Sequence, residues 1–142
     1  MATCTKLLIS RLYSYAKEAI DITSALVTGA NGFIGQHLVN VLEGHGFKVN
    51  TLVRNSRNYN IIGNVNLFEG NIFDTEVLGK AVDNVEIVFH LVAKTHDLSG
   101  IDNAKDYFRT NVEGTRSLLD VCSVSKIKHF NKPRKSYFIT YR

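Results

Sequence analysis

Three glycines stand at regular spacing after the first apolar run of the chain: Gly29, Gly32 and Gly35 in the segment TGANGFIG. A turn without side chains lets backbone N–H groups approach a pyrophosphate closely. A helix that begins near Phe33 would direct the positive end of its dipole toward the same anion. The pattern therefore predicts a phosphate-binding loop. The alternative is a tight strand–helix turn in which the glycines serve only packing.

Two histidines, His90 and His96, are of a type that binds metals or transfers protons. No carboxylate or second ligand stands at a diagnostic spacing from either, so a structural or solvated role is favoured. Cys4 and Cys122 lie far apart and form no Cys-x-x-Cys or Cys/His pattern, which argues against a disulfide framework and a zinc site. The sequence therefore predicts no metal site.

The elements that would position the glycine loop follow from the apolar pattern, which alternates between short β-branched runs and helical spacing. The predicted strands cover Ala25–Thr28, Lys48–Arg54, Val65–Phe68 and Glu86–Ala93. The predicted helices cover Phe33–Glu43, Asp74–Val82 with Asp74 as the N-cap, and Asp102–Ser123. This alternation predicts an α/β fold with a doubly wound parallel sheet, whose ligands lie at the carboxyl ends of the strands.

The chain has 142 residues, 44% hydrophobic and 21% charged, which is typical of one globular domain. No apolar run approaches the roughly 18 residues of a membrane span. From Lys126 onward there are six basic residues and no acidic one, and the rest carries 11 basic and 13 acidic residues. Because the positive charge is confined to a tail, nucleic-acid binding is not favoured.

The sequence divides into an N-terminal extension (1–23), a domain (24–130) and a divergent basic tail (131–142). In the extension, Leu8, Leu12, Tyr15 and Ala19 recur at helical spacing among serine, threonine and a few basic residues. This composition suits either an organellar transit peptide or an ordinary surface helix, and the second is favoured. We accordingly predict a cytoplasmic location, with a mitochondrial one as the alternative.

Four segments, in the expected order, resemble those of the extended short-chain dehydrogenases/reductases. This is the NAD(P)-dependent epimerase/dehydratase group, which acts largely on nucleotide sugars. The segments are TGANGFIG from Thr28, GNIFD from Gly70, FHLVA from Phe89 and NVEGT from Asn111. The resemblance covers about Ala25 to Phe130 and implies a Rossmann-type domain that binds NAD or NADP.

The resemblance also implies roles for particular residues. The pyrophosphate would be held by backbone groups of Gly29, Gly32 and Gly35 with Phe33 and Ile34, and Asn31 would also bind the cofactor. Asn71 and Ile72 would lie beside the adenine, and Leu91, Val92 and Ala93 would line the cofactor where it passes the central strand. Asn111 would brace the neighbouring strand. The alternatives are a plain core position for Leu91 to Ala93 and a solvated helix position for Asn111.

Two departures from the family pattern affect the choice of cofactor. NAD-binding sheets carry an acidic residue about 20 positions past the glycine loop, whereas this chain has Arg54 at the end of the second strand. Arginine cannot accept a hydrogen bond from a ribose hydroxyl, but with Arg57 it could pair with a 2′-phosphate. NADP is therefore at least as well supported as NAD, unless Arg54 is simply solvated. Asn71 replaces the usual aspartate and can still accept from the adenine amino group.

Members of this family use a Tyr-x-x-x-Lys pair on a helix after the fifth strand, with a Ser or Thr before it, to move a proton. The one Tyr-x-x-x-Lys here is Tyr13 to Lys17, with Ser10 before it, and it precedes the glycine loop. It cannot occupy the family position, so no catalytic residue is predicted and enzymatic activity stays open.

The family pattern ends after Phe130, where the chain continues with NKPRKS and Pro133 disfavours an interior strand. A truncated product, or a reading frame that departs near Phe130, would explain this. We expect a sheet truncated after about the fourth strand, which loses its outer neighbour or keeps a makeshift one. A second copy or a partner chain could add at that edge.

Three functions follow from these predictions. The first is an NAD(P)-binding domain that is catalytically incomplete alone. The second is a reductase or epimerase completed by a partner chain or by Tyr137 or Tyr141. The third is a nucleotide-responsive interaction module without catalysis. The substrate, the oligomeric state and the nature of the N-terminal extension are not determined by the sequence.

Overall fold

The computed structural model describes residues 2–18, 23–57, 59, 63–94 and 104–133. Its strands are β1 (Ser24–Thr28), β2 (Lys48–Val53), β3 (Val65–Glu69), β4 (Ile87–His90) and β5 (His129–Asn131). Its helices are α1 (Ala2–Glu18), α2 (Phe33–Gly44), α3 (Thr75–Val82), α4 (Ala104–Phe108) and α5 (Gly114–Ser123), with a π-helical turn, η1 (Arg109–Glu113), between the last two.

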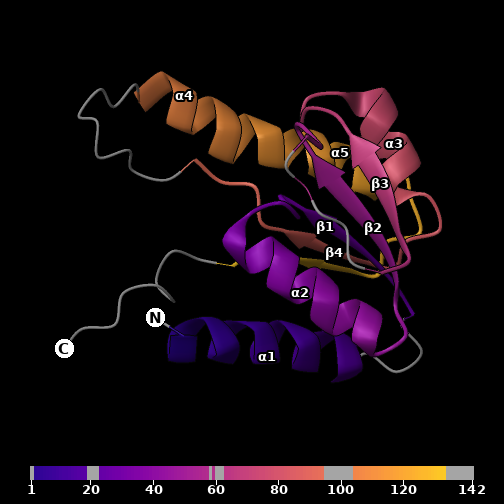
Figure 1. The fold of residues 1–142 in the computed structure, drawn as a ribbon. Coiled ribbons are helices and arrows are strands. Elements are labelled where there is room, and N and C mark those ends of the chain that lie inside the picture. Colours follow the sequence, from indigo (N-terminus) through magenta and orange to yellow (C-terminus); the bar gives the residue numbers. More distant parts are fainter. Residues whose placement is uncertain (1, 19–22, 58, 60–62, 95–103, 134–142) are drawn as a thin grey trace.

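The five strands form one parallel sheet in the order β3-β2-β1-β4-β5, which confirms the doubly wound α/β prediction. Successive side chains of a strand point to opposite faces. Ala25 and Val27 of β1 pack on the side of α2, whereas Leu26 packs on the side of α3 and α5. Both faces of the sheet are therefore covered, and Figure 1 shows the helices above and below it.

The helix limits follow local signals in the sequence. Asp74 caps α3 as predicted, because its carboxylate accepts from the amide of Val77 at 3.1 Å. The predicted helix Asp102–Ser123 is interrupted by η1, where the amide of Gly114 bonds the carbonyl of Arg109, five residues back. Asp102 lies outside the described residues. The interruption is a local widening of the helix, which apolar spacing does not reveal.

The structure differs from the sequence predictions in the length of β4 and in the strand beside it. The predicted strand Glu86–Ala93 has strand geometry only over Ile87–His90, because its neighbours β1 and β5 end there. A fifth strand, β5, pairs with β4 over three residues, so the described part of the sheet contains one strand more than the predicted four. This short strand is the makeshift neighbour that the sequence left open, and Pro133 lacks the amide needed to extend it.

Helix α1 lies against α2 on one side of the molecule (Figure 1). Its side chains Leu8, Ile9 and Leu12 are buried in the same hydrophobic cluster as residues of β1, β2 and β4. The face of α1 that carries these three side chains therefore packs onto the hydrophobic core.

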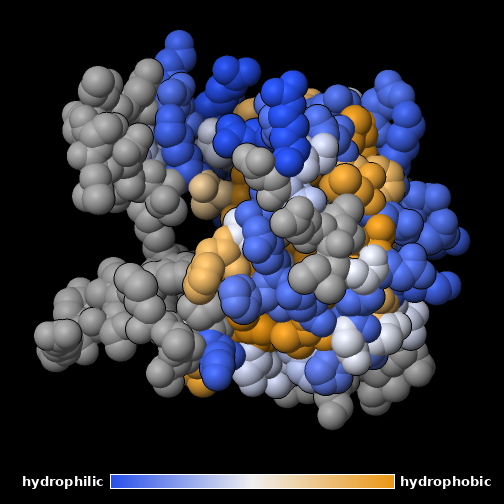
Figure 2. All heavy atoms as spheres, viewed as in Figure 1, coloured by the Kyte–Doolittle hydropathy of each residue, from blue (hydrophilic) through white to orange (hydrophobic). Residues whose placement is uncertain are grey.

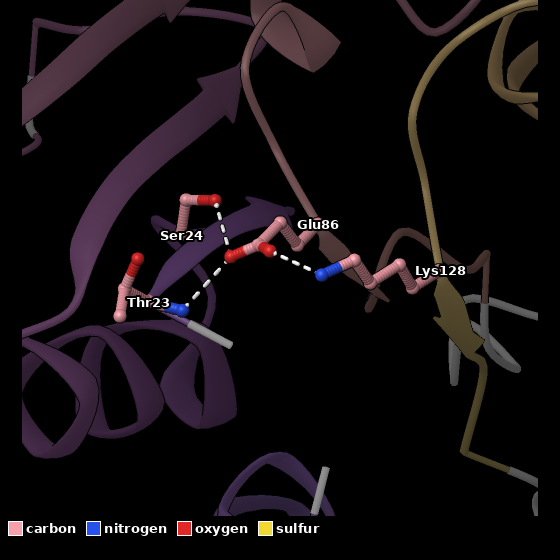
Figure 3. Close-up of polar contacts among 4 residues, drawn as sticks. All are labelled: Thr23, Ser24, Glu86 and Lys128. Atoms are coloured by element: carbon pink, nitrogen blue, oxygen red, sulfur yellow. Dashed lines mark hydrogen bonds and ion pairs between the residues drawn. The ribbon is translucent and has the colours of Figure 1, made fainter. Parts of the chain in front are cut away.

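The amino-terminal edge of the sheet is closed by a cluster of polar contacts around Glu86 (Figure 3). Its carboxylate accepts from the amide of Thr23 at 2.9 Å, the hydroxyl of Ser24 at 3.3 Å and the ammonium of Lys128 at 2.7 Å. Together these donors lower the pKa of Glu86 from 4.5 to about 2, with Lys128 as the largest cause. The cluster thus ties the starts of β1, β4 and β5 together.

Polar side chains cover most of the face visible in Figure 2, and apolar surface shows between them only in patches. Within the described part of the chain, no helix is both long enough and apolar enough to cross a membrane.

Candidate functional site

The glycine loop joins β1 to α2 at the carboxyl edge of the sheet. Gly29 has φ +70°, a conformation that favours glycine, and its amide donates to the carbonyl of Leu52 at 3.0 Å. A Cβ at this position would lie 3.1 Å from the amide nitrogen of Val92. The loop therefore closely approaches the segment that follows β4.

Gly35 has a different reason to lack a side chain. A Cβ there would lie 2.3 Å from the carbonyl oxygen of Gly29 and 2.7 Å from Cα of Ala30. The first turn of α2 is thus packed directly onto the backbone of the loop. Gly35 therefore lacks a side chain because of close packing between α2 and the loop, which is the role that the sequence analysis gave as the alternative to phosphate binding.

The N-terminal turn of α2 presents free amide groups. Gln36 is the first residue whose amide bonds within the helix, to the carbonyl of Gly32 at 3.0 Å. The preceding amides of Phe33, Ile34 and Gly35 consequently have no intrahelical acceptor. The N-cap residue Gly32 has no side chain to satisfy them, and the first turn contains no acidic residue. This end of the helix is suited to an anion.

An open cleft of about 800 Å³ lies beside the loop. Nine of the twelve predicted site residues line it: Gly29, Asn31, Gly32, Arg54, Asn71, Ile72, Leu91, Val92 and Ala93. They come from the four chain segments that follow β1, β2, β3 and β4 and meet where these parallel strands end. The other three, Phe33, Ile34 and Gly35, lie in the first turn of α2 and do not line the cleft, and the ring of Phe33 is exposed.

Sequence reasoning missed several residues that line the cleft. They are Leu52, Val53, Gly70, Phe73, Lys94, Asp106, Arg109 and Thr110. The last three come from α4 and η1, between one and five residues before Asn111. The spacing back from the Asn-Val-x-Gly-Thr segment could have indicated them, because a helix that braces the strand at Asn111 also brings its preceding turn to the same edge.

The cleft carries more positive than negative charge. Lys94 pairs with Asp106 at 3.1 Å, in a pair open to solvent. The guanidinium of Arg109 lies 5.2 Å from the ring centre of Phe73, within cation–π range. Among the described residues, neither Arg54 nor Arg109 forms an ion pair. Two arginines are therefore available to an anionic ligand.

The arginine at the end of β2 stands on a loop that is fixed to β3. Glu69, the last residue of β3, accepts from both the amide and the hydroxyl of Ser56. These bonds to Ser56 lower the pKa of Glu69, with a smaller contribution from Arg57. Arg54 lines the cleft, whereas Arg57 does not.

The wall near Asn71 is also ordered. The side-chain oxygen of Asn71 accepts from the amide of Phe73 at 3.3 Å, which orients the amide group. Ile72 is buried beneath it. A second lone pair on the Asn71 oxygen remains for a ligand donor.

Asn111 braces the segment after β4, as the resemblance implied. Its side-chain oxygen accepts from the amide of Lys94 at 2.7 Å, and its side-chain nitrogen donates to the carbonyl of Lys94 at 2.9 Å. Asn111 lies in the middle of the π-helical turn. This pair of bonds fixes the backbone at the end of the cleft wall.

His90 is a structural residue of the core rather than part of the cleft surface. Its Nδ1 lies 2.8 Å from the hydroxyl of Thr28 and its Nε2 lies 3.0 Å from the hydroxyl of Thr115. Because Thr115 donates its own proton to the carbonyl of Asn111 at 2.7 Å, Nε2 carries the proton and Nδ1 accepts. Burial, and secondly the charge of Lys132, lower the pKa of His90 to about 3. His96 lies outside the described residues.

The Tyr13 to Lys17 motif lies far from the cleft. The ring of Tyr13 contacts that of His45, with ring centres 4.1 Å apart, just past the last residue of α2. A helix of 12 residues spans roughly 18 Å, and the glycine loop lies at its other end. Tyr137 and Tyr141 lie outside the described residues. Within the part of the chain that is described, no three His, Cys, Asp or Glu side chains are arranged to hold a metal ion.

Comparison with known proteins places these features in context. Residues 25–135 match the model of the NAD dependent epimerase/dehydratase family. The chain is 31% identical over 126 residues to a dTDP-D-glucose 4,6-dehydratase from Dictyostelium discoideum. This match covers 80% of the chain and 29% of the dehydratase.

Two solved structures have a similar fold. A UDP-glucose 4-epimerase from Thermotoga maritima, solved with UDP-glucose, matches with a TM-score of 0.69 and 29% identity, over 77% of this chain and 37% of the epimerase. A UDP-glucose 4-epimerase from Brucella ovis, solved in complex with NAD, matches with a TM-score of 0.68 and 27% identity, over 78% of this chain and 35% of the epimerase. The chain thus spans about a third of the length of these proteins.

Proposed function

The chain belongs to the NAD-dependent epimerase/dehydratase family, and on this premise we propose that it binds NAD or NADP in the cleft beside the glycine loop. The observation that carries the proposal is that Gly32, the N-cap of a helix whose first amides lack an intrahelical acceptor, lines one open cleft together with two arginines that form no ion pair among the described residues. Both features favour a ligand with negative charge.

The geometry supports one orientation of the dinucleotide. The amide groups at the start of α2 would donate hydrogen bonds to the pyrophosphate, which Gly32 allows to approach closely. The adenosine half would lie toward Asn71 and Ile72, where an amide oxygen and an apolar surface suit an adenine ring. The nicotinamide half would pass Leu91, Val92 and Ala93. When bound, the cofactor would supply hydride chemistry.

The choice between NADP and NAD would rest on Arg54. It lines the cleft at the end of β2, where NAD-binding sheets place an acidic residue, and it has no ion pair within the described residues. A 2′-phosphate would provide that partner through charge-assisted hydrogen bonds. We therefore propose a preference for NADP.

The catalytic part of the function would not be supplied by these 142 residues alone. No Tyr-x-x-x-Lys follows the glycine loop in the sequence, and Tyr13 contacts the opposite end of α2. We propose that the chain binds the cofactor without transferring hydride by itself. Incubation with NADP or NAD and a nucleotide sugar such as UDP-glucose should then leave the sugar nucleotide unconverted and produce no absorbance of reduced nicotinamide.

A second candidate function is a nucleotide-responsive interaction module, for which the short edge strand gives a specific surface. β5 pairs with β4 over only three residues, and its other edge has no partner strand within the described residues. Further polypeptide, from a second copy or another chain, could pair there. A nucleotide-dependent change in molar mass, measured by light scattering, would support this function, and an unchanged mass would count against it.

Isothermal titration calorimetry with NADPH and NADH tests the main proposal, using Gly32→Asp and Gly32→Asn as a matched pair. Gly32 has φ −75°, and a Cβ there meets only the carbonyl oxygen of Gly29, at 3.2 Å, so both variants can be accommodated. Asp and Asn have the same size and both cap helices. The difference between the two variants therefore isolates a negative charge at the pyrophosphate position.

We expect wild-type protein to bind both nucleotides and Gly32→Asp to bind at least tenfold more weakly than Gly32→Asn. Absence of binding by folded wild-type protein would disprove the cofactor proposal. An Arg54→Ser variant should lose affinity for NADPH by on the order of tenfold, through loss of a charge-assisted contact, and leave the affinity for NADH within about twofold. Equal losses for the two nucleotides would contradict the preference for NADP.

A further inference from the structure

Lys132 belongs to the segment that the charge pattern assigned to a basic tail, yet its side chain is not a solvated charge. It is half-buried, and its ammonium donates to the carbonyl oxygen of Asn111 at 3.0 Å and to the hydroxyl of Thr115. Burial lowers its pKa. A lysine that gives up hydration in this way must be compensated by the acceptors it meets.

The acceptors of Lys132 lie directly behind the cleft wall. Asn111 stands in the π-helical turn, whose first two residues, Arg109 and Thr110, line the cleft. The side chain of Asn111 holds the backbone of Lys94, which lines the cleft from the other side. Lys132 itself does not line the cleft. Its contacts therefore reach the site only through Asn111 and Thr115.

Thr115 makes Lys132 part of a continuous polar chain. The hydroxyl of Thr115 accepts from Nε2 of His90, and Nδ1 of His90 accepts from Thr28, the residue before the glycine loop. The chain of contacts thus joins the ends of β1, β4 and β5 to η1. Of its members, only Lys132 lies outside the four family-like segments of the sequence, although it is within residues 25–135 that match the family model.

We propose that Lys132 is a positioning residue for the cofactor cleft, which holds the π-helical turn at Asn111 and so fixes the wall formed by Leu91 to Lys94. This inference rests on the proposed cofactor function. Lys132 stands after a strand of only three residues, where pairing with β4 has ended. The ammonium of Lys132 bonds one acceptor in η1 and one in α5. These bonds fix the end of β5 to the two helices, where its hydrogen bonds to β4 no longer do so.

The test compares binding of NADH and ADP to purified full-length variants by calorimetry. ADP engages the adenosine and pyrophosphate parts of the proposed site but not the wall at Leu91 to Lys94. Lys132→Met should weaken NADH binding by about tenfold and change ADP binding by less than twofold. Lys128→Met is the matched control, because it removes the other lysine near β5, at the opposite end of the sheet. It should lower the melting temperature without changing either affinity.

A double-mutant cycle with Asn111→Ala tests whether Lys132 acts through the brace. Adding Lys132→Met to Asn111→Ala should weaken NADH binding no further, because the brace is already lost. Additive effects, or equal NADH affinity of wild type and Lys132→Met, would overturn the inference while leaving the cofactor proposal intact. Failure of wild-type protein to bind NADH would overturn both.

If Lys132→Met does not fold, amide hydrogen exchange in Lys132→Gln is measured in place of NADH and ADP binding. The inference predicts that the amide of Lys94, which donates to Asn111, exchanges at least tenfold faster than in wild type. The amide of Val88, in the middle of β4, should keep its rate. Equal acceleration at both amides would indicate general destabilisation and would overturn the inference.

Discussion

The two ends of the parallel sheet use their polar groups in different ways. At the amino-terminal edge, the carboxylate of Glu86 accepts from Thr23, Ser24 and Lys128, and the four residues satisfy one another. At the carboxyl-terminal edge, the N-cap of α2, Gly32, and the residues Arg54 and Arg109 line a cleft, and among the described residues neither arginine has an ion-pair partner.

The difference follows from the direction of the strands. The strands of the sheet are parallel, so the segments that leave the carboxyl ends of β1, β3 and β4 lead toward α2, α3 and α4, and helix N-termini gather there. Each N-terminus brings amide groups that its own helix cannot bond. The amino-terminal edge has no such excess of donors, so one carboxylate can close it. One edge thus contributes stability, and the other retains groups for a ligand.

The largest effect is expected where the cleft edge is packed most tightly. Gly35→Ala would place a Cβ 2.3 Å from the carbonyl oxygen of Gly29, so α2 must shift away from the loop. We expect a loss of about 3 kcal/mol in the free energy of unfolding, measured by urea denaturation, together with loss of NADH binding. We expect the loss of stability and the loss of NADH binding in the same variant, because both depend on the contact between α2 and the loop.

Gly79→Ala is the matched control for this substitution. Gly79 also lies within a helix, but a Cβ there meets nothing within 4 Å. The change should raise the free energy of unfolding by about 0.5–1 kcal/mol and leave NADH affinity unchanged. A loss of stability in Gly79→Ala equal to that of Gly35→Ala would show that close packing of the loop is not the cause.

The next effect concerns the buried histidine beneath the cleft. Burial lowers the pKa of His90 from 6.5 to about 3. Between these pH values the imidazole of His90 is therefore protonated in the unfolded chain and neutral in the folded protein. Stability should therefore fall as the pH is lowered from 6.5 toward 3, with a slope of at most about 1.4 kcal/mol per pH unit from this group. His90→Gln should be about 2 kcal/mol less stable at pH 7 but should lose less stability between pH 6.5 and 4.5.

Chemical denaturation at a series of pH values measures this difference. His45→Gln is the control, because the ring of His45 is exposed just past the end of α2. It should keep the pH dependence of the wild type. An unchanged slope in His90→Gln would contradict a neutral, buried His90.

The smallest effect on stability is expected at the amino-terminal edge of the sheet, in the cluster around Glu86. The pKa of Glu86 lies at about 2 rather than 4.5, chiefly because of Lys128, so the stabilisation is complete above pH 4.5 and is lost as the pH falls toward 2. Glu86→Gln should cost about 1 kcal/mol at pH 7 and flatten the stability profile between pH 4.5 and 2. Thermal unfolding at these pH values measures the change, and NADH affinity at pH 7 should stay within twofold.

Glu76→Gln serves as the comparison for Glu86. Its ion pair with Lys80 is exposed on α3 and should contribute little to the free energy of unfolding. If Glu86→Gln were no more costly than Glu76→Gln, the cluster at the amino-terminal edge would be an ordinary surface pair and the contrast between the two edges would be weaker.

Much of the fold was predictable because its signals are local. The alternation of buried strands and amphipathic helices, the cap at Asp74 and the glycine loop each depend on residues close together in the sequence. Parallel strands must end at one edge, so the predicted segments around Gly29, Asn71 and Leu91 could be expected to meet there.

The tertiary structure decided what depends on contacts between distant segments. Sequence pattern did not show that β4 ends at His90, because the strand stops where its neighbours stop. It assigned Lys132 to a charged tail, and only the fold places its ammonium against Asn111.

The sequence by itself determined the fold class, the loop that a dinucleotide requires and the family. Only the tertiary structure decided which polar groups are satisfied within the chain and which face the cleft. The physical reason is that the state of a hydrogen-bonding group depends on its burial and its partners, and for His90, Glu86 and Lys132 those partners lie 17 to 63 residues away in the sequence.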